Sequence, residues 1–324
     1  MTTSRNPSHN IGLELVRVTE AAALAAGRWL GRGDRDSAND AATEAMVEIL
    51  NHLNIDGLIV VGEEGRLHEH SPLDSGMKVG TGRGPQVDVV VNPVDGAGLV
   101  AGAKPYAISV AGIAPRGTMW SPNLAVYMEK IVVDREVAES LVPECLDAPA
   151  GWTIALVARI KDKPIEDIVV FVLERPRHAH LIEEIRAAGA RALLRPGGDI
   201  NGALMAVDPN TSVDLLMGIG GVPEGVIAAC AIKSLGGAML GRLAPQSNEE
   251  GASLDEAGTD QLKILSSDEM IASQKIFFAA TGITDGRLLT GVRYRGRLAE
   301  THSIVLRGET RTRRIIHTEH VVKP

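Results

Sequence analysis

Asn92 and Asp95 stand three residues apart, directly after a run of mostly β-branched residues at 87–91. The run predicts a largely buried strand, and the proline and glycine that follow predict that the backbone then leaves the sheet in a turn. Polar side chains at such a strand end face a crevice, where two oxygen atoms can converge on one point. Acids at both positions, with a hydroxyl two residues after the second, would hold Mg²⁺ against a phosphate ester. Here the first position is an amide, and Ala97 stands where the hydroxyl would be.

Three other short patterns could bind anions or metal ions. Arg175 and Arg177, separated by one proline after a predicted strand, offer two guanidinium forks to an oxyanion. The segment GGVPEG at 220–225 predicts a turn into a helix whose first N–H groups can face an anion. His68 and His70 could point together at a softer metal such as Zn²⁺, or could be two ordinary histidines in a solvated loop.

Helical and strand-like segments alternate along the chain. Apolar residues at helical spacing predict a helix over residues 11–30, ending at glycines. Further predicted helices lie at 41–53, 179–188 and 226–232, and predicted strands at 58–61, 87–91, 107–113, 130–133, 167–173 and 212–216. Strands interleaved with helices predict layered α/β packing. A domain boundary is expected near residues 134–152, dividing the chain into halves at 1–145 and 146–324.

The composition narrows the class of protein. A chain of 324 residues can build one large or two ordinary domains. The formal net charge of -8 argues against a nucleic-acid partner, and two distant cysteines argue against a disulfide framework. No apolar stretch is long enough to span a bilayer, and no basic leader precedes one, so we expect a cytoplasmic protein without a membrane partner.

Basic residues near the C-terminus alternate with Thr and Ile in a strand-like segment: Arg307, Arg311, Arg313 and Arg314. No aromatic side chains are interleaved for stacking on bases, so the pattern indicates a solvated or subunit-facing strand rather than a nucleic-acid patch. Arg307 could also reach a phosphate.

Short segments from end to end of the chain resemble those of the class II fructose-1,6-bisphosphatases, members of the lithium-sensitive, metal-dependent sugar phosphatase superfamily. They are ELVRVTE at 14–20, WLGRGD at 29–34, VGTGRG at 79–84, YMEK at 127–130, RPRH at 175–178, GIGGVPEG at 218–225 and ATGIT at 280–284. The resemblance implies an α/β fold, layered as an α-β-α-β-α sandwich, and a homodimer or homotetramer. It also implies phosphoric monoester hydrolysis of a phosphorylated sugar in gluconeogenesis, with Mg²⁺ or Mn²⁺ and no organic cofactor.

Members of this family carry five acids around their metal ions. The resemblance places these positions at Asn39, Glu63, Asn92, Asp95 and Glu224, so two of the five are amides. Mg²⁺ prefers charged oxygen, and an amide offers only a dipole, so we expect weaker binding of at least one metal ion. The family also has Thr at the position of Ala97, where it helps to orient or activate the attacking water. The loop after Glu63 is one residue longer here.

The residues that would bind the sugar phosphate are better preserved. The resemblance assigns a phosphate to Arg175 and Arg177, and substrate contacts to Tyr127 and Glu224. The family's Asp-Gly-Asp, which contacts sugar hydroxyls, reads Gly197-Gly198-Asp199 here. One carboxylate is therefore gone, and the ligand need not be fructose 1,6-bisphosphate.

Several interpretations are compatible with these residues. Asn39 and Asn92 could be caps or turn formers satisfied by the backbone, or replacements made to trap a substrate complex. The chain could be a metal-dependent sugar phosphatase of weakened activity or shifted specificity, or a sugar-phosphate-binding regulator without hydrolysis. It could also be an isomerase or lyase acting on a phosphorylated sugar, with Glu64, His68 or His70 as general acid or base.

Overall fold

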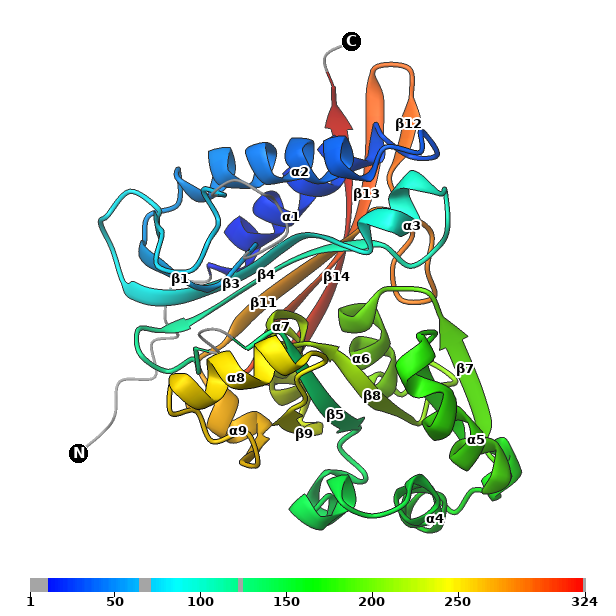
Figure 1. Cartoon of the computed structure of the whole chain (residues 1–324). Coiled ribbons are helices and arrows are strands. Elements are labelled where there is room, and N and C mark those ends of the chain that lie inside the picture. Colours follow the sequence, from blue (N-terminus) through cyan, green and yellow to red (C-terminus); the bar gives the residue numbers. More distant parts are fainter. Residues whose placement is uncertain (1–10, 64–70, 122–124, 323–324) are drawn as a thin grey trace, which may run out of the picture.

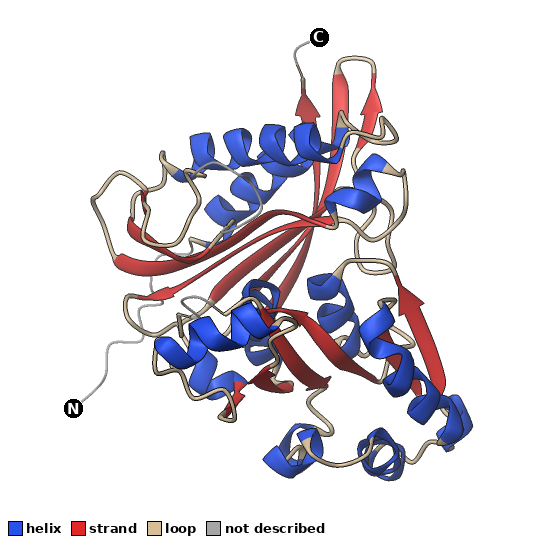
Figure 2. Ribbon diagram, viewed as in Figure 1, coloured by secondary structure: helices blue, strands red, loops and turns tan. Residues whose placement is uncertain are grey.

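The computed structural model describes residues 11–63, 71–121 and 125–322, which form five layers (Figure 1, Figure 2). Helices α1 (Gly12–Gly27) and α2 (Arg35–Leu50) cover the outer face of an eight-stranded sheet. Helices α6 (Asp199–Val207) and α7 (Val222–Leu235) lie between this sheet and a six-stranded sheet, whose far face is covered by α4 (Ala150–Ile160) and α5 (Ala179–Ala187). This α-β-α-β-α sandwich confirms the expected fold.

The eight-stranded sheet has the order β12-β13-β11-β4-β3-β1-β2, with β14 paired to β13. Its strands are β1 (Asp56–Val61), β2 (Lys78–Val79), β3 (Gln86–Asp95), β4 (Ile108–Pro115), β11 (Phe277–Gly282), β12 (Arg293–Arg295), β13 (Leu298–Arg307) and β14 (Thr312–Val321). The six-stranded sheet has the order β10-β9-β5-β8-β6-β7. Its strands are β5 (Tyr127–Val133), β6 (Val169–Leu173), β7 (Arg191–Arg195), β8 (Leu215–Gly221), β9 (Ala238–Leu243) and β10 (Ile264–Ser266).

The shorter helices lie at the edges of these layers. They are α3 (Ala97–Ala101), α8 (Asn248–Glu256) and α9 (Ser267–Met270), with the 3-10 helices η1 (Ala138–Ser140), η2 (Pro143–Leu146), η3 (Ile165–Asp167) and η4 (Pro176–His178). Of these, α3 follows β3 and η4 follows β6, and both contribute residues to a cleft called the central pocket.

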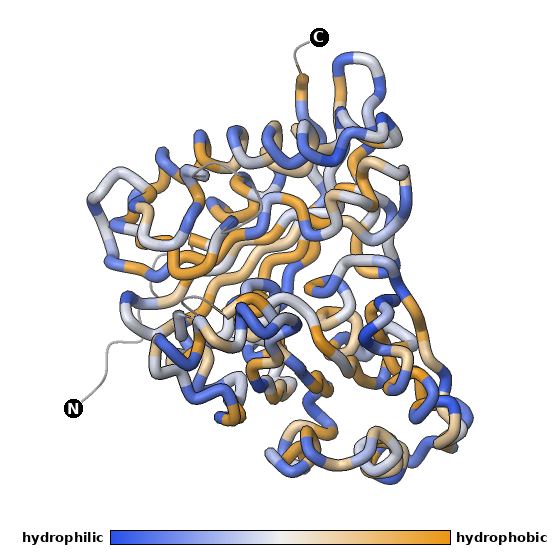
Figure 3. Tube along the Cα trace, in the orientation of Figure 1, coloured by the Kyte–Doolittle hydropathy of each residue, from blue (hydrophilic) through white to orange (hydrophobic). Residues whose placement is uncertain are grey.

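Three apolar cores hold the layers together, and Figure 3 shows that the strands of the larger sheet are mostly hydrophobic. Leu15 and Met46 bury the helices α1 and α2 against the large sheet. Phe278 and Ile227 belong to the central core between the sheets, and Ile154 to the outer core under α4. Burying each such side chain stabilises the fold by about 1.5–3 kcal/mol. The interlayer positions are accordingly mostly aliphatic, with several Met and Phe residues in the central core.

Several predicted boundaries differ from the observed ones, and two of these differences have a clear physical cause. The second helix was expected at 41–53 but begins at Arg35, because the Asp34 carboxylate accepts the N–H of Ser37 at 3.0 Å and so caps it. The strand expected to end before Pro93 continues to Asp95. Its pairing with β4 shifts register between Asn92 and Asp95, which accommodates a proline that has no N–H to donate.

The expected turn at residues 220–225 is also absent. Strand β8 runs to Gly221, and helix α7 begins at the next residue, so the strand passes directly into the helix. Pro223 lies at the start of α7, where its missing N–H is harmless.

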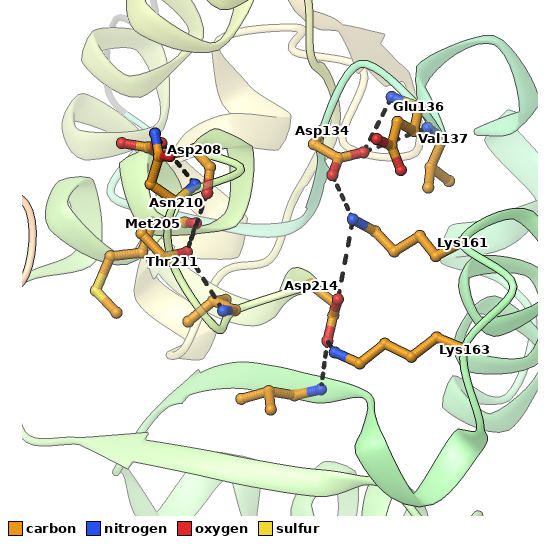
Figure 4. Close-up of polar contacts among 12 residues, drawn as sticks. Asp134, Glu136, Val137, Lys161, Lys163, Met205, Asp208, Asn210, Thr211 and Asp214 are labelled. Carbon is orange, nitrogen blue, oxygen red and sulfur yellow. Dashed lines mark hydrogen bonds and ion pairs between the residues drawn. The ribbon is translucent and has the colours of Figure 1, made fainter.

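A row of ion pairs fixes the beginnings of two strands in the smaller sheet (Figure 4). Lys161, just after α4, pairs with Asp134 and lies 3.9 Å from a carboxylate oxygen of Asp214. Lys163 lies 2.6 Å from the other oxygen of Asp214, which also accepts the N–H of Val169 at 2.9 Å. Strands β6 and β8, which lead to the central pocket, are therefore anchored at their far ends.

We expect Gly202→Ala to destabilise the protein, although alanine is the better helix former. Gly202 lies within α6, and a Cβ there would lie 2.5 Å from Cζ of Phe171. Overpacking of this kind costs about 1–3 kcal/mol. The matched control is Gly251→Ala in α8, where the nearest atom to the new Cβ is Pro245 Cγ at 3.8 Å. Urea unfolding should show the control unchanged or stabilised by up to about 1 kcal/mol, and equal effects of both changes would contradict the packing argument.

Both sheets draw strands from each side of residue 145. Strand β5 of the N-terminal half belongs to the smaller sheet, and β11 to β14 of the C-terminal half belong to the larger one. The division into halves at 1–145 and 146–324 stays a prediction. No helix in the described part of the chain combines the length and the apolar character that crossing a membrane requires.

Candidate functional site

A cleft of about 630 Å³, here called the central pocket, is lined by most of the predicted site residues. It is lined by the start of α2, the turn from β3 into α3, the region of η4, and the beginnings of α6 and α7. The predicted site residues on its wall are Asn39, Asp95, Ala97, Tyr127, Arg175, Arg177, Gly197, Asp199 and Glu224. Positions far apart in the sequence thus share one cleft, as their expected roles require.

Asn39 and Glu63 form a buried hydrogen-bonded pair beside the pocket. Glu63, just after β1, is 1% exposed, and Asn39, on α2, is 7% exposed. The Asn39 amide Nδ2 donates to Glu63 Oε2 at 3.1 Å, and the Thr43 hydroxyl donates to the same oxygen at 2.7 Å. Neutral donors therefore face the Glu63 carboxylate. Two acids at these positions would repel each other unless they shared a proton or a cation lay between them.

Asp95 binds the beginning of helix α6. Its Oδ2 accepts the backbone N–H of Ile200 at 3.1 Å and of Asn201 at 3.3 Å. A carboxylate is favourable there because the first N–H groups of a helix lack partners within the helix and carry partial positive charge. Asn92 is 1% exposed and pairs in register with Val110. The Asp95 carboxylate therefore satisfies two N–H groups in the first turn of α6, and Asn92 is buried within the sheet.

Ala97 is the first residue of α3 and lies on the pocket wall, after Gly96 in a left-handed conformation (φ 95°). Its methyl group can neither accept nor donate a proton. His68, His70 and Glu64, the residues expected to supply a softer metal site or a general acid or base, lie outside the described residues.

Arg175, Arg177 and Tyr127 form the basic side of the pocket. Arg177 donates to the carbonyl of Ile219 at 3.0 and 3.3 Å, and its guanidinium lies 4.9 Å from the centre of the Tyr127 ring. Arg175 donates to the carbonyl of Glu174 at 2.9 Å. Both guanidinium groups lie on the wall of the central pocket, and their role in binding an oxyanion stays a prediction. Arg307, by contrast, is absent from the pocket lining and pairs with Glu309 at 2.6 Å.

His178 ties this basic side to strand β8. Its Nε2 accepts the N–H of Ile219 at 2.8 Å, so Nδ1 must carry the proton that is donated to the carbonyl of Leu173 at 2.6 Å. Burial lowers the pKa of His178; Arg177 and Arg175 lower it further, whereas the Leu173 carbonyl and Asp199 oppose them. The neutral imidazole therefore bridges two strand ends at the pocket.

This bridge should make stability depend on pH. Because the folded-state pKa of His178 is lowered from 6.5, its contribution is complete above that value and is lost as pH falls toward the lowered pKa. We expect the free energy of unfolding to fall more in the wild type than in His178→Gln between about pH 7.5 and 5.5. The control is His180→Gln, an exposed neighbour that should keep the wild-type pH dependence. Identical pH dependence in wild type and His178→Gln would contradict the bridge.

Asp199, the first residue of α6, forms a buried ion pair with Lys130 of β5. The two side chains are 8% and 2% exposed, and the Lys130 ammonium donates to Asp199 Oδ2. Gly197 lies on the pocket wall near Leu99. The resemblance places a carboxylate at this position, and glycine has no side chain to supply one. Asp199 is thus the acid that the segment 197–199 retains.

Only weak patterns in the sequence point to some of these residues. Lys130 follows Glu129 in β5, so the strand has two charged residues in a row, and the partner of Lys130 lies 69 positions further on. Arg35 and Lys104 also line the pocket and were not expected there. Thr43 and His178 act through hydrogen bonds to groups that no local pattern identifies.

The described residues that were expected to hold a metal ion make other contacts in this structure. Within residues 11–63, 71–121 and 125–322, no group of three His, Cys, Asp or Glu side chains is arranged to hold a metal ion. The Asn39 amide group is directed at Glu63, and one Asp95 oxygen is occupied by two N–H groups. We therefore derive no catalytic step through a metal ion.

The five-layer sandwich, with a pocket lined by arginines, acids and an amide, is the architecture of the sugar phosphatase class of α/β protein. The family model for bacterial fructose-1,6-bisphosphatase, glpX-encoded, matches residues 9–320. The chain belongs to this class II fructose-1,6-bisphosphatase family.

Two relatives illustrate the match. The class 2 fructose-1,6-bisphosphatase of Haemophilus influenzae is 40% identical over 325 aligned positions, covering 96% of each chain. Fructose-1,6-bisphosphatase 1 class 2 of Escherichia coli K12 is 38% identical over 324 positions, covering 96% of this chain and 95% of the relative. The likeness therefore extends over essentially the whole length of both.

Proposed function

We propose that this chain binds a phosphorylated sugar in the central pocket, and that Mg²⁺-dependent hydrolysis of the bound ester is strongly weakened. The names of the two relatives support the class of ligand. The hydrogen bond from Asn39 to Glu63 is the single observation that carries the second part, because a neutral donor stands where the family has an acid.

Phosphate binding is assigned to the basic side of the pocket. Each guanidinium has five N–H donors, of which Arg175 uses one and Arg177 two in the contacts described above. The remaining donors can bind phosphate oxygens in the paired geometry that arginine offers. Tyr127 packs against Arg177 and contacts the bound ligand, and Asp199 accepts hydrogen bonds from its hydroxyl groups.

Groups that hydrolysis needs are missing at Asn39, Asn92 and Ala97, where the resemblance places two acids and a hydroxyl. Phosphate monoesters hydrolyse very slowly without a catalyst, so the attacking water must be positioned and the developing charge must be balanced. Ala97 can position no water, and amides at 39 and 92 leave Glu63, Asp95 and Glu224 as the remaining acids of the five expected metal positions. Binding can survive these changes, whereas efficient hydrolysis requires more than the remaining groups provide.

An isomerase or lyase activity is less well supported. It would depend on Glu64, His68 or His70, which lie outside the described residues. The homodimer or homotetramer, the cytoplasmic location and the absence of an organic cofactor stay predictions.

Calorimetric titration tests the binding half of the proposal. We expect fructose 1,6-bisphosphate to bind in the presence of EDTA, because arginine side chains rather than metal ions hold the phosphate. Unphosphorylated fructose is the control and should give no signal. Binding that appears only after Mg²⁺ is added, or no binding under either condition, would overturn the proposal.

A further inference from the structure

We infer that Lys130 is a positioning residue that sets the sugar specificity of the central pocket by holding the Asp199 carboxylate toward ligand hydroxyl groups. The inference rests on the proposed function and goes one step deeper, from the class of ligand to the residue that discriminates within it. Lys130 lies behind the pocket wall and is not itself among the residues that line the pocket.

The ion pair commits one oxygen of Asp199 and leaves the other to a ligand. Asp199 Oδ2 accepts from the Lys130 ammonium. Oδ1 is buried and has no hydrogen-bond partner among the described residues, although Asp199 lines the pocket. A buried carboxylate oxygen without a donor is unfavourable, so a ligand hydroxyl that donates to it gains a charge-assisted hydrogen bond.

The residues on either side of Asp199 define the position of this ion pair. A Cβ at Gly220 would overlap Asp199 Oδ2 and lie 2.5 Å from the Lys130 Nζ, so the ion pair occupies the space that the glycine leaves on β8. On the other side, Asp95 binds the N–H groups of Ile200 and Asn201, directly after Asp199. The backbone at Asp199 and its carboxylate therefore have separate anchors, and Lys130 is the one that acts on the carboxylate.

The chemistry of a carboxylate determines what it can select. It accepts hydrogen bonds from hydroxyl groups and repels phosphate groups, so it favours a phosphorylated sugar over an alkyl phosphate of the same length. Arg175 and Arg177 recognise the phosphate in both kinds of ligand. Lys130 should therefore govern the preference between the two ligands and contribute little to phosphate affinity as such.

The test compares two probes by calorimetry, fructose 1,6-bisphosphate and hexane-1,6-diol bisphosphate, which has the two phosphates without the sugar hydroxyls. We expect the wild type to bind the sugar about 10- to 100-fold more tightly, the effect of a hydrogen bond to a charged group. Lys130→Met should remove most of this preference while binding of the diol bisphosphate changes little. Lys78→Met, at an exposed position of β2, is the control and should keep the preference.

The double variant Lys130→Met, Asp199→Asn separates recognition from folding. Lys130→Met leaves a buried carboxylate without a partner and can unfold the protein, whereas the neutral pair removes that penalty. We expect the double variant to regain thermal stability relative to Lys130→Met but not the preference for the sugar. Recovery of both would show that Lys130 serves only the fold and would overturn the inference.

The wild-type measurement separates the two levels of the proposal. Equal affinity of the wild type for the two probes would overturn the role of Lys130 and leave phosphate binding intact. Failure of the wild type to bind either probe would overturn the proposed function itself, and the inference with it.

Discussion

Restoring the two acids and the hydroxyl, in the triple variant Asn39→Asp, Asn92→Asp, Ala97→Thr, is expected to raise Mg²⁺-dependent phosphate release by about 10²- to 10⁴-fold, the range of single catalytic groups. The first change would place two carboxylates against each other at the buried Glu63 position, where Asn39 now donates a hydrogen bond. Such a pair needs either a shared proton or a cation to balance it, and Mg²⁺ can supply the cation. Mg²⁺ should therefore also raise the unfolding temperature of the triple variant more than that of the wild type.

The control carries the same change in charge on the surface. Asn54→Asp and Asn248→Asp alter two exposed residues that do not line the central pocket. This control should change neither phosphate release nor stabilisation by Mg²⁺. A triple variant that still binds fructose 1,6-bisphosphate but releases no more phosphate would mean that the site has been rebuilt for different chemistry.

Replacing both Arg175 and Arg177 by Ala is expected to abolish thermal stabilisation by fructose 1,6-bisphosphate. At a ligand concentration of 100 times Kd, binding stabilises a folded protein by about 2.7 kcal/mol, and this increment should disappear. The physical reason is the loss of both guanidinium groups from the basic side of the pocket. Differential scanning fluorimetry with and without the ligand measures the effect directly.

Arginines outside the pocket provide the comparison. Arg159→Ala together with Arg186→Ala removes two exposed guanidinium groups from α4 and α5, and the ligand should still stabilise this control. Arg177 also bonds the carbonyl of Ile219, so the unfolding temperature without ligand shows whether the fold survives. Unchanged stabilisation by the ligand in the pocket variant would refute phosphate binding at these residues.

The layers of the fold were predictable because their signals are local. Periodic apolar residues such as Leu15 identify a helix, and runs of β-branched residues such as 87–91 identify a buried strand. Pro93 misled the prediction, since the penalty of a proline in a strand disappears where the register shifts, and the register depends on β4. The direct passage from β8 into α7 likewise depends on tertiary packing rather than on local turn residues.

The sequence indicated which residues could lie together, but it missed Arg35 and Lys104 and did not reveal the contacts between residues. Resemblance of short segments placed Asn39, Asp95, Arg177 and Asp199 at one site, and the central pocket is lined by all four. Their partners could not be read from spacing: Asp95 meets the N–H of Ile200 across 105 positions of sequence. Such contacts are set by how the layers pack, which periodicity does not encode.

The most direct test of the central proposal follows phosphate release and the sugar NMR spectrum in one sample of protein and fructose 1,6-bisphosphate, with Mg²⁺, Mn²⁺ or Zn²⁺ present. Calorimetry on the same preparation establishes that the ligand is bound. We predict a bound sugar phosphate whose spectrum stays unchanged and whose phosphate is released far below the usual enzymatic range of about 1–10³ per second. Phosphate release within that range, or a changed sugar without phosphate release, would contradict the proposal.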